Sequence, residues 1–97
     1  MLYAIVCTDH PESGELRSRT RPPHLDFLMQ AGERVVSAGA LLSEDGGAPQ
    51  GSLIIYEADS LDEARAFAAD DPFARAGVFA HVAIHPWRVL PKGGERR

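Results

Sequence analysis

The sequence contains a single cysteine, Cys7, among 97 residues. One cysteine cannot form an internal disulfide, and a structural zinc site normally uses two or more thiols. We therefore expect a reducing compartment, the cytoplasm. The N-terminal apolar run at residues 1–6 has no basic residue before it and is too short for a signal-peptide core or a membrane span, so we expect no membrane partner.

An excess of positive charge is also missing. Fourteen acidic and ten basic residues give a net charge of −4. A nucleic-acid-binding protein needs a basic face that displaces counterions from phosphates, so we expect no nucleic-acid partner. Apolar residues make up 44% and charged residues 25% of the chain, which is typical of a globular domain and argues against global disorder.

A chain of this length forms one domain. We place that domain at residues 1–90 and a flexible tail at 91–97, where Gly93 and Gly94 lie among basic residues. Folding buries about 65% of the surface that an unfolded chain of this size exposes, so stability is marginal. A second copy of the chain would supplement this small core.

Four segments have the pattern of β-strands. Residues 2–7 are mostly aliphatic and unbroken by glycine or proline, which predicts a central strand buried on both faces. Further strands are predicted at 34–40, 52–57 and 78–90. Residues 41–51 are rich in glycine and predict a flexible connection between the second and third strands.

Two segments predict helices. In residues 16–32, Leu25, Leu28 and Met29 form an apolar stripe, and Gly32 suits the C-terminal cap. Pro22-Pro23 would begin the main part of this helix, because a proline in the first turn gives up an N–H that has no partner there. The spacing of Ser60 and Glu63 is a capping box that starts a helix running to about Asp70.

The step Asp71-Pro72 predicts one short extra turn, with the aspartate as N-cap and Gly77 at the end. The complete order is βαββαβ. It predicts an α+β, ferredoxin-like fold with two helices on one face of a four-stranded antiparallel sheet. The other face also needs a cover, and a second subunit is the simplest one.

Three groups of residues resemble the YciI (YCII-related) family. They are the run Arg21-Pro22-Pro23-His24-Leu25, the step Ala38-Gly39-Ala40, and the block from Asp71 to Phe79 with Ile84-His85-Pro86-Trp87 after it. The resemblance covers roughly residues 1–90, with Ala40 where the family usually has a proline. It implies a dimeric α+β barrel, in which two subunits pack sheet against sheet and each keeps a pocket between its sheet and helices.

The resemblance also implies a catalytic pair, His24 with Asp71. Imidazole exchanges protons near neutral pH, because its unperturbed pKa is about 6.5. A carboxylate on its other nitrogen would fix the tautomer and stabilise the imidazolium. Each residue also has an ordinary interpretation, His24 as a first-turn helix residue and Asp71 as an N-cap.

Arginines recur at positions 17, 19 and 21 and could attract an anionic substrate. We assign Arg17 and Arg19 to a solvated basic loop and Arg21, which belongs to the motif, to the pocket. Ser37 could donate a hydrogen bond from the second strand. We therefore predict Arg21, Ser37 and Gly39 as substrate contacts.

The remaining candidates predict neither a metal site nor a cofactor. His81 and His85 share one face of a strand but lie about 13 Å apart, too far for one metal ion. Cys7 is predicted as a buried, small apolar residue.

These features favour a small-molecule enzyme that uses cofactor-free general acid–base chemistry, namely isomerisation, elimination or hydrolysis. The first alternative is a non-catalytic module that binds a small ligand or dimerises. A second alternative is haem- or metal-assisted oxidation, as some relatives in the barrel superfamily perform.

Overall fold

Four antiparallel strands form one sheet in the computed structural model, which describes residues 1–90. The strands are β1 (Leu2–Asp9), β2 (Val35–Leu42), β3 (Pro49–Glu57) and β4 (Phe79–Trp87). They lie in the order β2-β3-β1-β4, so the predicted central position of β1 is confirmed. The predicted flexible tail at 91–97 lies outside the described residues.

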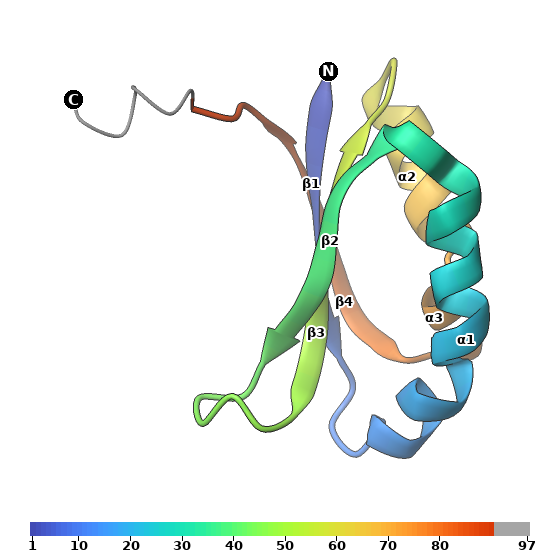
Figure 1. The fold of residues 1–97 in the computed structure, drawn as a ribbon, viewed down its shortest axis with the longest axis vertical. Helices are drawn as coiled ribbons and strands as arrows, with labels where there is room; N and C mark the ends of the chain where they lie inside the picture. The colour runs from blue at the N-terminus through green and yellow to red at the C-terminus, as the bar shows by residue number, and fades with distance from the viewer. Residues whose placement is uncertain (91–97) are drawn as a thin grey trace.

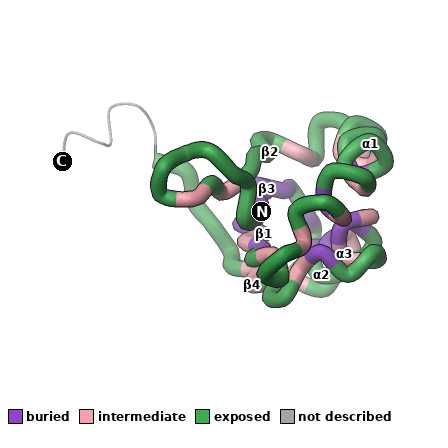
Figure 2. Tube along the Cα trace, turned by 90° about the horizontal axis from the view of Figure 1, so that it is seen from below, coloured by how far each residue is buried: buried purple, intermediate pink, exposed green. Residues whose placement is uncertain are grey.

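The helices α1 (Gly14–Ala31), α2 (Leu61–Asp70) and α3 (Pro72–Ala76) all lie on one face of the sheet (Figure 1). The order is therefore βαββαβ with the short α3 added before β4, which confirms the ferredoxin-like α+β prediction. Side chains alternate along a strand, and those beneath the helices are buried: Tyr3, Ile5, Cys7, Ile54 and Tyr56. Figure 2 shows these buried stretches in β1 and β3.

None of the helices within residues 1–90 lies on the opposite face of the sheet (Figure 1). The strand register places Val6 opposite Leu53 and Leu2 opposite Trp87, so these four side chains share that face. Leu53 is 37% and Trp87 is 39% exposed. The prediction that β1 is buried on both faces therefore holds for the helix side, whereas the other side is only partly covered within one chain.

The start of α1 differs from the prediction. The helix begins at Gly14, so Pro22 and Pro23 lie inside it and not in its first turn. A proline inside a helix removes a backbone hydrogen bond and crowds the preceding turn, which bends the helix. In Figure 1 the first turns of α1 run at an angle to the remainder. The predicted end is confirmed, because Gly32 caps α1 with a φ of 61°.

The predicted ends of α2 and α3 are confirmed. Ser60 accepts a hydrogen bond from the Glu63 N–H at 3.1 Å. The Glu63 carboxylate accepts from the Asp59 N–H and not from the Ser60 N–H that completes a capping box. Asp71 caps α3, and Gly77 ends it in the left-handed conformation with a φ of 87°.

The connection predicted at 41–51 is shorter in the structure. β2 continues to Leu42 and β3 begins at Pro49, so the two strands form a hairpin around residues 43–48. Asp45 accepts hydrogen bonds from the Ser43 hydroxyl at 2.6 Å and from the Gly47 N–H at 2.9 Å. These bonds order the turn and lower the pKa of Asp45.

At the other sheet edge β4 ends at Trp87, short of the predicted residue 90. Within residues 1–90, no helix is long and apolar enough to cross a membrane.

Candidate active site

His24 and Asp71 form a buried pair between α1 and the start of α3. Nδ1 of His24 lies 2.8 Å from Oδ1 of Asp71, and both side chains are almost inaccessible to solvent. The ordinary interpretation of His24 as a first-turn residue is wrong, because it lies in the second half of α1. The fold therefore brings together two residues that are far apart in the sequence.

The Asp-Pro step explains how Asp71 is held in place. Proline at the first position of α3 fixes the start of the helix, and Oδ1 of Asp71 accepts the Phe73 N–H at 2.9 Å. The same oxygen accepts from His24, so the cap and the imidazole share one carboxylate. An ionised Asp71 requires the Nδ1–H tautomer of a neutral His24, which leaves the Nε2 lone pair free.

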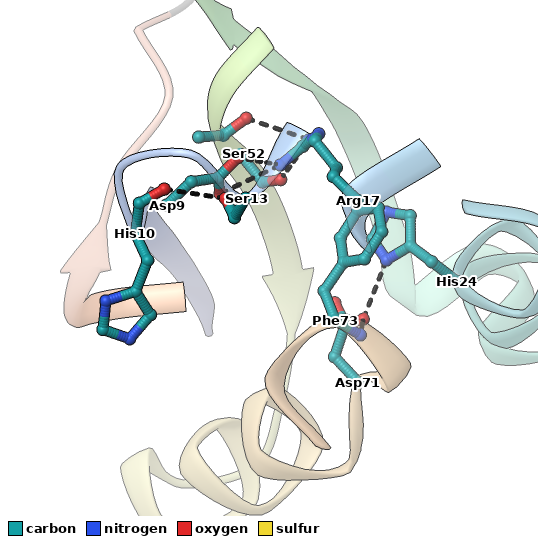
Figure 3. A network of polar contacts seen from close by, with 9 residues as sticks. Asp9, His10, Ser13, Arg17, His24, Ser52, Asp71 and Phe73 are labelled. Atoms are coloured by element: carbon teal, nitrogen blue, oxygen red, sulfur yellow. Dashed lines mark hydrogen bonds and ion pairs between the residues drawn. The ribbon is translucent and has the colours of Figure 1, made fainter. Parts of the chain in front are cut away.

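Phe73 connects this pair to a second buried ion pair. Its ring stacks on the His24 imidazole with the centroids 3.9 Å apart, and the Arg17 guanidinium carbon lies 4.6 Å from the Phe73 centroid (Figure 3). Both contacts restrict the ring planes. The orientation of His24 therefore depends on packing by Phe73 as well as on Asp71.

Arg17 is not in a solvated loop as predicted. It is 7% exposed, and its guanidinium donates to both carboxylate oxygens of Asp9, at 2.8 and 3.0 Å. It also donates to the Gly51 carbonyl at 3.1 Å and to the Ser52 hydroxyl at 2.9 Å, as Figure 3 shows for the serine. One side chain thus ties α1 to β1 and β3.

A cavity of about 170 Å³ opens beside both pairs. It lies between α1, α3 and the strands β2 and β3, which is the predicted position between helix and sheet. Its lining residues are Arg17, Arg21, His24, Leu25, Leu28, Ala38, Gly39, Ala40, Ser52, Ile54 and Phe73.

Two of the three predicted substrate contacts, Arg21 and Gly39, line this cavity, whereas Ser37 does not. Ser37 pairs with Ile55, on the face without helices, because an irregularity in β2 shifts the register before Ser37. Ser52, on the neighbouring strand, supplies the hydroxyl that lines the cavity.

The other candidate groups do not contribute to the cavity. Cys7 is buried as predicted, and burial together with the nearby carboxylates of Asp71 and Asp9 raises its pKa to about 12, which keeps the thiol protonated. Within residues 1–90, no three side chains of the metal-ligating types gather at one point.

Sequence reasoning missed Asp9, Arg17, Ser52 and Phe73. The alternation of arginines gave no signal that one of them is buried, because the bond from Arg17 to Asp9 depends on how the loop between β1 and α1 turns. Phe73 lies in the motif block after Asp71, but only the geometry reveals its contact with His24. A signal for Asp9 was its position at the end of a buried strand.

Comparison with known proteins agrees with this architecture. The YCII-related domain family matches residues 1–88. The protein YciI of Escherichia coli O6:H1 is 37% identical over 93% of this chain and 99% of its own length. An uncharacterised protein of Haemophilus influenzae is 35% identical with the same coverage.

Two solved structures share the fold. A 5-chloro-2-hydroxyhydroquinone dehydrochlorinase from Burkholderia phenoliruptrix AC1100, in complex with 2,5-dihydroxybenzoquinone, has a TM-score of 0.83 and 33% identity, covering 91% of this chain and 94% of that one. An antibiotic biosynthesis monooxygenase, with a TM-score of 0.57 and 13% identity, covers 94% and 100% and shares the fold alone. The architecture is therefore that of the dimeric α+β barrel superfamily, and the chain belongs to the YciI (YCII-related) family.

Proposed function

We propose that this protein is a cofactor-free enzyme that performs general acid–base chemistry, an elimination in the first instance, on a small molecule bound in the cavity. The observation that carries the proposal is the buried contact of 2.8 Å between Nδ1 of His24 and Oδ1 of Asp71. His24 also lines the cavity, so it contacts both its orienting group and the space where a substrate would bind. A general base must lie within hydrogen-bond reach of both its orienting group and its substrate.

In the proposed reaction, Nε2 of His24 takes a proton from the substrate. The electrons of the broken bond form a new double bond, and the leaving group departs with its own bonding pair, so the elements of an acid HX are removed. Asp71 accepts the Nδ1–H and stabilises the imidazolium, which then returns its proton to water. This step requires neither an oxidant nor a metal ion.

The relatives support elimination over isomerisation and hydrolysis. A dehydrochlorinase removes a proton and chloride, and the solved enzyme with that name shares a third of this sequence and nearly all of the fold. Its bound dihydroxybenzoquinone is a single ring. A cavity of about 150 Å³ is known to hold benzene, and the cavity here is of similar size, about 170 Å³.

A thermal-shift screen of single-ring compounds, followed by chromatography of each hit, tests this proposal. An enzyme should consume a stabilising compound, and His24→Ala should abolish consumption. Asp71→Asn is the more specific variant, because it removes the negative charge of the carboxylate while the Asn carbonyl can still cap α3. Stabilisation by a compound that remains unchanged would favour a non-catalytic binding module.

We also propose that the working form is a homodimer in the cytoplasm. The sheet face without helices exposes Leu53 and Trp87, and an apolar face of this kind is normally covered. The single cysteine suits a reducing compartment.

A further inference from the structure

Among residues 1–90, the wall of the cavity contains two arginines, a histidine and a serine but no carboxylate. Its polar side chains are Arg17, Arg21, His24 and Ser52. The two nearby acids, Asp9 and Asp71, do not line the cavity and are engaged by Arg17 and His24. A ligand in the cavity therefore contacts the arginine side chains, whereas the compensating carboxylates of Asp9 and Asp71 do not line the cavity.

The two arginines differ in how their charge is used. Asp9 neutralises Arg17, and four N–H bonds to Asp9, Gly51 and Ser52 fix its guanidinium. Arg21 is exposed and forms no ion pair with any of residues 1–90. Arg21 is thus free to bind an anion, whereas Arg17 is a fixed part of the wall.

The rest of the wall sets the shape of the ligand. Leu25, Leu28, Ile54 and Phe73 are apolar, and Gly39 with its two alanine neighbours leaves room along β2. A space of about 170 Å³ lined in this way accommodates one six-membered ring with small substituents.

We infer that the cavity selects single-ring anions, with the ring against the apolar wall and the negative oxygen of the ligand on the guanidinium of Arg21. The inference rests on the proposed function only in assigning the substrate to this cavity. It adds that the ionised form of a ring compound, such as a phenolate, an enolate or a carboxylate, is the species recognised.

Titration of the full chain with benzoate and benzamide, followed by ¹H–¹⁵N NMR, tests the inference without any turnover. The two probes have the same ring and differ in charge at pH 7. Benzoate should bind about tenfold more tightly than benzamide, because a charge-assisted bond to arginine is added. The shifted amides should include those of Gly39 and Phe73.

Arg21→Gln should lower the affinity for benzoate about tenfold and leave that for benzamide unchanged. Arg19→Gln is the matched control, since Arg19 is exposed on the same helix but does not line the cavity. Inorganic phosphate, an anion without a ring, should bind more weakly than benzoate.

Equal affinities for benzoate and benzamide, absence of binding by both, equal effects of the two arginine variants, or tighter binding of phosphate would each overturn the inference. A preference for benzoate without consumption of any ring compound would instead refute the proposed enzyme and leave the anion selectivity intact.

Discussion

At the scale of single residues, two buried pairs meet at one aromatic ring. The ring of Phe73 contacts Arg17, which pairs with Asp9, and it also contacts His24, which pairs with Asp71. Removing one partner of a buried ion pair leaves an uncompensated charge, which costs about 3–5 kcal/mol. The first pair should therefore matter for stability as well as for the position of the imidazole.

Arg17→Gln should lower the free energy of unfolding by about 3–5 kcal/mol in urea titration, because Asp9 is left buried and unpaired. Arg19→Gln, on the surface, should change it by less than about 0.5 kcal/mol. Adding Asp9→Asn to Arg17→Gln should recover part of the loss. Equal effects of the Arg17 and Arg19 variants would contradict the role given to the pair.

Cys7 gives a pH dependence of stability. Its pKa is raised from 9.0 to about 12 by burial and nearby carboxylates. The unfolded thiol releases its proton from about pH 9, whereas the folded thiol keeps it, so the unfolded state binds fewer protons and stability falls from about pH 9 to pH 12. Cys7→Ala should flatten this part of the profile of unfolding free energy against pH, and an unchanged slope would refute the assignment.

The residue scale also marks the limit of prediction from sequence. His24 and Asp71 could be named because they lie in motifs that resemble a family. Arg17 could not, since its partners come from β1 and β3. Ser37 lies outside the cavity because one irregularity in β2 shifts the register before it and turns its side chain to the other face of the sheet.

At the scale of elements, β1 and β3 approach each other closely at Gly51, next to the cavity. A Cβ on Gly51 would lie 2.3 Å from the Cys7 carbonyl oxygen and 3.1 Å from Cδ1 of Leu41. The Gly51 carbonyl accepts from Arg17, so any shift of this backbone reaches the cavity.

Gly51→Ala should therefore lower the free energy of unfolding by about 1–3 kcal/mol, as overpacking does in other proteins. Gly14→Ala is the control, because a Cβ there meets nothing within 4 Å. Thermal unfolding of both variants checks the prediction. It fails if the Gly51→Ala and Gly14→Ala variants have the same Tm.

Helix and strand boundaries were predictable where a cap or a buried run marks them, as at Ser60, Asp71 and Gly32. They were not predictable where two local preferences compete. Pro22-Pro23 favours a helix start, but packing of α1 against the sheet extends the helix across it. The glycines of 41–51 favour a loop, but strand pairing extends β2 to Leu42 and starts β3 at Pro49.

At the scale of the whole molecule, the proposed homodimer covers the face of the sheet that carries no helix within residues 1–90. Leu53→Lys places a charge in the middle of this face and should convert a dimer into a monomer in sedimentation equilibrium, with the mass falling to that of one 10.5 kDa chain. Met29→Lys, at a position that is 78% exposed on α1, should leave the dimer intact. A wild-type monomer at micromolar concentration would contradict the proposed assembly.

The whole account depends on His24 acting as a base oriented by Asp71, and the rate at which the protein consumes a single-ring compound that stabilises it in the thermal-shift screen tests this most directly. The wild-type protein should consume the compound, and His24→Gln and Asp71→Asn should each lower kcat by about 10²–10⁴-fold while remaining folded. A folded His24→Gln variant that consumes the compound at the wild-type rate, or a wild-type protein that consumes no stabilising compound, would contradict the account.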